Sequence, residues 1–254
     1  MKYIYLLILM CCIFPSSAQT FTETGKTYPV NTEGDKCVIN GFTTFNGFSD
    51  EKIYANTLLW AIENICPQLR EGLTNIDVPN KTFDCEFTLG SSAESGLNNT
   101  YYVKATFRVA DGKLLYYLHD VLIESTVLVM KKVTPLEKLA PEKKVAHKKT
   151  MDDFVKSESS MLNKLFDFIA TYQLAPITHW SDIAICRPVE GMNEDECRLA
   201  FGKPQSIIET NGETQWMYTS SFYLFFQNGK VNAARKSKVD DNTAKMQSIK
   251  WLGV

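Results

Sequence analysis

The sequence lacks an excess of charge of either sign. Its 254 residues include 27 Lys and Arg against 29 Asp and Glu, which gives a formal net charge of −2. A protein that binds nucleic acid is expected to present a strongly basic face, because phosphate contacts dominate that affinity. The charge balance therefore argues against nucleic acid as a partner.

Long hydrophobic runs are also lacking, apart from one at the N-terminus. Lys2 precedes an apolar run over 3–14, Pro15 ends this run, and small residues follow up to Ala18. The run is shorter than a bilayer-spanning helix, and its layout is typical of a secretory signal peptide over 1–18. The chain is therefore expected to be exported to the periplasm, to the outer membrane or out of the cell.

Lipidation at Cys11 or Cys12 is the alternative interpretation of the same segment, although neither cysteine follows the small residue that lipidation prefers. No second apolar run reaches spanning length, so we expect no membrane span and, at most, peripheral membrane contact. Residues 19–35 are polar with scattered Gly and Pro, which predicts a flexible leader.

Histidine is scarce, and the motifs of common nucleophile, metalloprotease and nucleotide sites are absent. The histidines are His119, His147 and His179. His119 precedes Asp120 in a predicted strand, so their side chains are expected on opposite faces of the sheet. His179 opens a His-Trp-Ser-Asp run, but sequence adjacency does not create triad geometry. We therefore predict no catalytic, cofactor-binding or metal-binding residues and no enzyme activity.

Beyond the predicted signal peptide the cysteines are odd in number: Cys37, Cys66, Cys85, Cys186 and Cys197. An odd number leaves at least one thiol unpaired in an exported protein. Their spacings match no zinc site, and we interpret them first as small buried hydrophobes. Cys186 with Cys197 is the first pair to test for a disulfide, although connectivity cannot be read from sequence.

Residues 36–173 are predicted to form a first α+β domain. Its expected elements are a strand at 37–39, a helix at 51–65, a strand at 82–90 and a hairpin over 101–123. Tyr54, Leu58 and Ile62 recur at helical spacing, whereas apolar and polar residues alternate in the strands. Asp111 and Gly112 provide the positive φ angles that a two-residue hairpin turn requires.

Residues 131–149 hold seven lysines and two prolines, which predicts a Lys-rich linker before the last helix of this domain. Contact with an anionic surface, such as lipid headgroups, is the less favoured function for this segment. Thr150 and Asp153 resemble a capping box, and an apolar stripe continues from there to Tyr172. The helix that follows is expected to cover one face of the preceding sheet.

Residues 174–254 are predicted to form a second α+β domain, again an antiparallel sheet with a helix packed on one face. Asn193 is expected to cap a helix at 194–201, and Gly202 to end it. The acidic residues at 194–196 suit the positive end of the helix dipole better than a cation site. The expected strands lie at 206–210, 212–218 and 222–227, with a last strand from Lys230.

The strand at 222–227 carries aromatic residues on both faces, and only one face can pack on the helix. The second face predicts either a partner surface or a contact with the first domain. We select Trp216, Tyr218, Tyr223 and Phe225 as the candidate protein-binding surface.

The C-terminal part resembles the BamE/SmpA family of outer-membrane assembly lipoproteins, whose fold is shared with beta-lactamase-inhibitor proteins. The matching positions are Gly191-Met192, Gly202-Lys203-Pro204, Trp216, Tyr218, Phe226 and Asn228-Gly229-Lys230-Val231. The family's lipidated cysteine has no counterpart here. The resemblance implies a helix followed by a strand meander, and a place in the cell envelope.

The N-terminal part is similar to an uncharacterised family of exported bacterial proteins with a TATA-binding-protein-like domain. Tyr54, Trp60 and Gly112-Lys113 carry this likeness. This likeness implies a TATA-binding-protein-like fold, and no activity comes with it.

We expect an exported, non-catalytic binding or scaffold protein of the bacterial cell envelope, whose partner is another envelope protein. An inhibitor of a secreted or periplasmic hydrolase is the alternative, and it predicts a protruding loop that fits an active site. An enzyme that uses Cys or His is the further alternative, and it predicts a pocket with a polarised side chain of either type.

Overall fold

A computed structural model provides the structure of this chain. It describes residues 20–236, except 24–25, 30, 34–35, 67–69, 128–129, 140–144 and 211, and it also describes 248–249. The expected signal peptide at 1–18, with Cys11 and Cys12, lies outside the described residues. None of the described helices is both long and apolar enough to cross a membrane.

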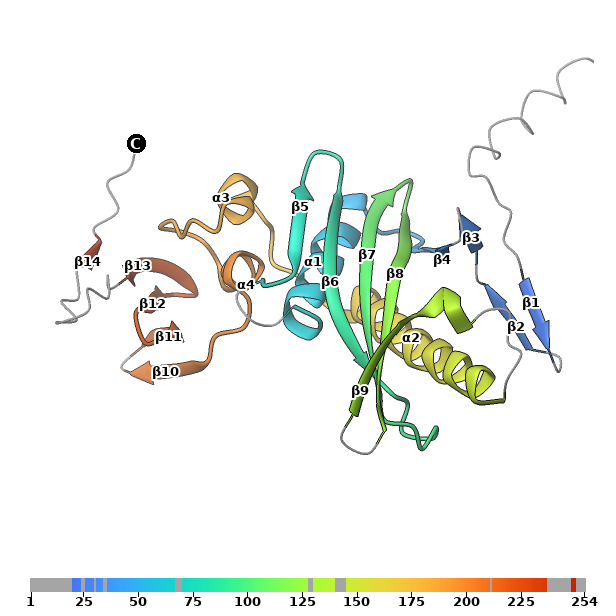
Figure 1. The fold of residues 1–254 in the computed structure, drawn as a ribbon. Coiled ribbons are helices and arrows are strands. Elements are labelled where there is room, and N and C mark those ends of the chain that lie inside the picture. The colour runs from blue at the N-terminus through green and yellow to red at the C-terminus, as the bar shows by residue number, and fades with distance from the viewer. Residues whose placement is uncertain are drawn as a thin grey trace, which may run out of the picture.

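A seven-stranded antiparallel sheet forms the first unit, in the order β3-β4-β8-β7-β6-β5, with β9 also paired to β8 (Figure 1). Its strands are β3 (Asn31–Glu33), β4 (Lys36–Thr44), β5 (Leu73–Asp77), β6 (Thr82–Gly90), β7 (Asn99–Ala110), β8 (Lys113–Val127) and β9 (Met130–Pro135). A separate hairpin consists of β1 (Thr20–Glu23) and β2 (Lys26–Pro29).

Alternation along β7 explains how this sheet acquires one apolar face. Tyr101, Val103 and Phe107 are buried, whereas the intervening Tyr102 and Lys104 are exposed. Asp111 and Gly112 adopt φ angles of 54° and 69°, so the predicted tight turn between β7 and β8 is confirmed.

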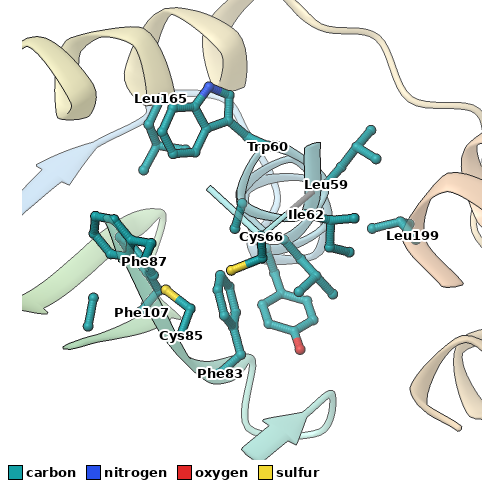
Figure 2. Packing of buried hydrophobic residues seen from close by; sticks show 14 of the residues in the cluster. Leu59, Trp60, Ile62, Cys66, Phe83, Cys85, Phe87, Phe107, Leu165 and Leu199 are labelled. Carbon is teal, nitrogen blue, oxygen red and sulfur yellow. The ribbon is translucent and has the colours of Figure 1, made fainter. Parts of the chain in front are cut away.

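Two helices cover the apolar face, α1 (Asp50–Asn64) and α2 (Val145–Thr171) (Figure 1). The side chain of Ser49 accepts a hydrogen bond from the Lys52 amide and so caps α1. Trp60 of α1 lies beside Leu165 of α2, over the sheet (Figure 2). The predicted α+β class, with helices on one face of an antiparallel sheet, is confirmed.

Two segments that were predicted to be irregular contain secondary structure. The expected leader at 19–35 contains the strands β1, β2 and β3. Their Thr and Tyr residues favour β structure. The expected linker at 131–149 contains most of β9, a short 3-10 helix η1 (Leu136–Leu139) and the start of α2. The side chain of Leu136 is fully buried, and Lys131 pairs with Glu124 at 2.8 Å on an edge strand. The linker prediction was therefore wrong for the described part of the segment.

The predicted capping box at Thr150 was also wrong, because α2 begins five residues earlier, at Val145. The hydroxyl of Thr150 donates to the Ala146 carbonyl inside the helix. The buried carboxylate of Asp153 instead accepts hydrogen bonds from the amide and hydroxyl of Ser92 and from the Tyr101 hydroxyl, at 2.5–2.8 Å. Asp153 therefore joins α2 to the sheet.

The second unit contains α3 (Trp180–Ala184), α4 (Glu194–Phe201), β10 (Ser206–Thr210), β11 (Glu213–Thr219), β12 (Phe222–Gln227), β13 (Lys230–Lys236) and β14 (Ser248–Ile249). These strands form a meander in sequence order. Asn193 and Glu196 make the predicted capping box, and Gly202 ends α4 with a φ of 80°. Asn228 and Gly229 also have positive φ, as the predicted turn requires.

The two units share a continuous apolar core. Leu199 of α4 approaches Leu59 and Ile62 of α1 (Figure 2), and α4 lies between its own sheet and α1 (Figure 1). The division into domains at 173/174 stays a prediction.

Candidate binding surface

Strand pairing in the meander determines which of its side chains share a face. Trp216 lies opposite Leu224, and Met217 lies opposite Tyr223. Because alternate residues of a strand point to opposite faces, Trp216 and Leu224 share the inner face and Met217 and Tyr223 share the outer face. The four residues predicted as a binding surface therefore come from two different faces of the sheet.

The inner face is covered by α4, and it contains two of the predicted surface residues. Trp216 and Tyr218 are only 3% and 1% exposed. The ring of Trp216 lies 4.6 Å from that of Phe226, and the ring of Tyr218 lies 5.6 Å from that of Phe201 on α4. Their assignment to a binding surface was wrong, because both side chains belong to the core of the second unit.

The outer face contains Tyr223 and Phe225, both half-buried. Pairing adds Met217 beside Tyr223, and it places Ile208, which is 53% exposed, in the same row as Phe225. The guanidinium of Arg235 lies 5.0 Å from the centre of the Phe225 ring. We call Ile208, Met217, Tyr223 and Phe225, with Arg235 at the rim, the outer patch.

Sequence reasoning missed Ile208 and Met217. A residue-by-residue count across the turn at 219–221 would have found Met217, because it stands opposite Tyr223. Ile208 needed the pairing of β10 as well.

The junction between the units runs through helices, with α4 packed against α1 (Figure 1). Arg198 of α4 binds Glu63 of α1 through two hydrogen bonds, Nε–Oε1 at 2.6 Å and Nη2–Oε2 at 2.7 Å. Arg198 also donates to the Tyr172 hydroxyl, which donates to Asp195 at 2.8 Å. The charged partners raise the pKa of Arg198 against the opposing effect of burial. This network holds the meander in one orientation on the first unit.

A second arginine joins the units from the first unit's side. Arg70 donates through Nη1 to the carbonyl oxygens of Ile183 at 2.6 Å and Ala200 at 3.3 Å. Trp180 of α3 donates to Glu51 at 3.0 Å, and its ring lies 5.6 Å from that of Tyr54. Trp180 thereby covers Tyr54, which is buried in the interior.

The acidic start of α4 has structural partners. Glu196 is 1% exposed, and its carboxylate accepts hydrogen bonds from the backbone amides of Thr178, Asn193 and His179. Nδ1 of His179 lies 3.0 Å from the same carboxylate. Burial alone would raise the pKa of Glu196, but these hydrogen bonds hold the pKa below its ordinary value. Glu196 therefore fixes the helix start and joins it to the segment at 178–179.

His119 and Asp120 were expected on opposite faces, and this expectation was wrong. Asp120 has a φ of 49°, and the pairing of β7 with β8 shifts register beside it. A bulge of this kind turns consecutive side chains toward one side. Nδ1 of His119 therefore lies 3.1 Å from the Asp120 carboxylate, on a partly exposed strand.

Cys186 and Cys197, the first disulfide pair to test, are both free thiols. Cys186 is exposed, with its sulfur 3.1 Å from Nη1 of Arg70. Cys197 is fully buried on α4, and burial raises the pKa of its thiol.

Cavities open among the described residues, and two of them bear on the enzyme alternative. One, of about 730 Å³, lies between β5 and α3 and is lined by Ile76, Val78 and Trp180 among others. The other, of about 470 Å³, lies between α1, β6 and α2 and includes Lys156 and Ser157. The described residues that line them include no histidine and no cysteine. Neither cavity presents the side chains that a Cys- or His-dependent enzyme would need.

Comparison with known proteins yields two structural neighbours. A TBP-like protein from Parabacteroides distasonis is 10% identical, with a TM-score of 0.49 over 57% of this chain and 99% of its own. A DUF4468 family protein from Bacteroides ovatus is 17% identical, with a TM-score of 0.43 over 58% of this chain and 94% of its own. No family model and no curated protein matches the chain.

Proposed function

We propose that this chain is an exported, non-catalytic binding protein of the cell envelope and that the outer patch contacts its partner. The outer patch carries the proposal. It combines two aromatic rings, Tyr223 and Phe225, with Ile208 and Met217 on one face of the sheet, and Arg235 lies beside them. Aromatic residues, Met and Arg are enriched in the centres of protein–protein interfaces.

The partner that suits this patch is a folded envelope protein with an apolar surface and a carboxylate opposite Arg235. The arginine already lies over the Phe225 ring, so it can keep this contact and still offer N–H groups to an acidic residue. The layout of 1–18 as a signal peptide supports export. The resemblance of the C-terminal part to the BamE/SmpA family supports the envelope as its place of action.

Cross-linking in intact cells, followed by purification of the tagged full chain, tests this proposal. Phe225→Ala and Tyr223→Ala should each lower recovery of the cross-linked partner at least about tenfold if they are central interface residues. Phe42→Ala is a matched control, because Phe42 is 62% exposed on the first unit and lies under Lys113 as Phe225 lies under Arg235.

Equal recovery of the partner with wild type and with both folded outer-patch variants would refute the assignment of the surface. Loss of recovery with Phe42→Ala as well would show that the effect is not specific to the outer patch. Recovery of the chain only from the cytosol would refute export.

A further inference from the structure

Two cysteines of the first unit face each other across its core. Cys66 directly follows the C-terminal end of α1, where its amide donates to the Ala61 carbonyl at 2.8 Å. Cys85 lies in the middle of β6, between the same-face neighbours Phe83 and Phe87. Both side chains extend into the space between the helix and the sheet (Figure 2). Both are free thiols in this structure.

The backbone around the pair is held tightly. Both cysteines are buried, at 2% and 1% exposure. The Glu86 amide donates to the Gly72 carbonyl at 2.8 Å, and Sγ of Cys66 lies 3.8 Å from the Glu86 carbonyl oxygen. Gly72 has a φ of 87°, and a Cβ at this position would lie 2.5 Å from the Glu86 oxygen. The loop after α1 is therefore fastened to β6 next to the two sulfurs.

Two further free thiols, Cys186 and Cys197, lie in different surroundings. Cys186 is exposed beside Arg70, and Cys197 lies in the core of the second unit. A disulfide requires two cysteine side chains that approach each other, and those of Cys66 and Cys85 enter the same space from the end of α1 and from β6 (Figure 2).

We infer that Cys66 and Cys85 form a disulfide bond when the chain folds in an oxidising compartment. A disulfide donor, either a protein or a small molecule, supplies the oxidising equivalents. The Cys66 thiolate attacks one donor sulfur, the donor's S–S bond breaks, and one donor sulfur leaves as a thiol. The Cys85 thiol then loses its proton and attacks the Cys66 sulfur, which releases the second donor sulfur. Two cysteine thiols are oxidised and one donor disulfide is reduced.

The order of these steps follows from the two environments. The hydrogen bond from Cys85 lowers the pKa of the Cys66 thiol. The same hydrogen bond, together with burial, raises the pKa of the Cys85 thiol. Cys66 is therefore the better first nucleophile, because the thiolate is the reactive form.

The bond would fasten the end of α1 to β6. This end of α1 also carries Glu63, which binds Arg198 of the second unit. The disulfide would thus stabilise α1, the helix that contacts the second unit through Glu63. Its formation in the cell rests on the proposed export, because the cytosol keeps thiols reduced.

Refolding of the purified full chain in a glutathione redox buffer tests the inference independently of compartment. The product is alkylated in denaturant, digested, and analysed by mass spectrometry. We expect one linked peptide pair that contains Cys66 and Cys85, and a melting temperature higher by roughly 5–10 °C than that of the reduced protein. Cys66→Ser and Cys85→Ser should lack the linked pair, whereas Cys197→Ser, which removes a buried thiol outside the pair, should retain it.

Full alkylation of Cys66 and Cys85 in the refolded wild-type chain would overturn the inference, as would linkage of either one to a different cysteine. The wild-type result does not depend on whether the serine variants fold. Analysis of the chain recovered from its native cells then tests export separately. A bond that forms in glutathione buffer but is absent in cells would count against the proposed export while leaving the pairing established.

Discussion

Glu158 of α2 is a buried carboxyl group whose charge should weaken the fold at neutral pH. Its side chain is 6% exposed, and it has a hydrogen bond to the Ser159 hydroxyl at 3.1 Å. Burial raises the pKa of Glu158 from 4.5 to about 7, with a smaller opposing effect of the Ser159 hydrogen bond. The charge also raises the pKa of Tyr116, which faces it from β8 and is itself affected mainly by burial.

The folded protein therefore holds this proton to a higher pH than the unfolded chain does. Between pH 4.5 and about 7 the folded state binds more protons, so the free energy of unfolding falls as the pH rises. The cost of the buried charge is about 1 kcal/mol near pH 5 and about 3 kcal/mol near pH 8. Glu158→Gln removes the charge and keeps an oxygen that can accept the Ser159 hydrogen bond.

Urea denaturation of wild type and Glu158→Gln near pH 5 and near pH 8 measures the effect. We expect the variant to gain about 2 kcal/mol relative to wild type between the two conditions. Glu94→Gln is the control, because the Glu94 side chain is 82% exposed and its pair with Lys156 lies at the surface. A difference between wild type and Glu158→Gln that does not change with pH would refute the reasoning.

Three further predictions concern the second unit and its junction. Trp216→Ala should lower the free energy of unfolding by about 3–5 kcal/mol, and Tyr223→Ala by no more than about 1 kcal/mol, in urea titrations, because only Trp216 is in the core. Arg198→Ala should lower the free energy of unfolding by about 2–3 kcal/mol, because it leaves the half-buried Glu63 carboxylate without its partner. Adding Glu63→Gln to Arg198→Ala should recover part of this loss. Asn193→Ala should lower the free energy of unfolding by about 1 kcal/mol in thermal denaturation, because α4 loses its cap. Asn193→Ser should keep most of this stability, because Ser also caps helices.

The outcomes for Glu196 and Thr150 show how far capping signals can be read from sequence. Asn193 and Glu196 form the expected box, because the residues that cap a helix and the helix start are local to one another. The same kind of pattern at Thr150 was misleading. There the helix had already begun at Val145, and Asp153 is used by Ser92 and Tyr101 of the sheet. A contact between residues so distant in the chain has no local signature.

Local sequence patterns were enough to predict the α+β class, the positions of α1 and α4 and the two hairpin turns at 111–112 and 228–229. Each depends on side-chain periodicity or on backbone preferences of neighbouring residues. The sequence also placed aromatic residues on both faces of β12, as the burial of Leu224 and Phe226 between less buried neighbours shows.

Which aromatic residues stay available for a partner depends on strand pairing and helix packing. Register across three strands set Trp216 inward and Met217 and Ile208 outward, and α4 then covered the inner face. The environments of Cys66, Cys85 and Glu158 likewise depend on tertiary contacts. Whether two thiols meet, or a carboxyl group loses its water, depends on how a helix docks on a sheet, and docking joins segments that the sequence leaves far apart.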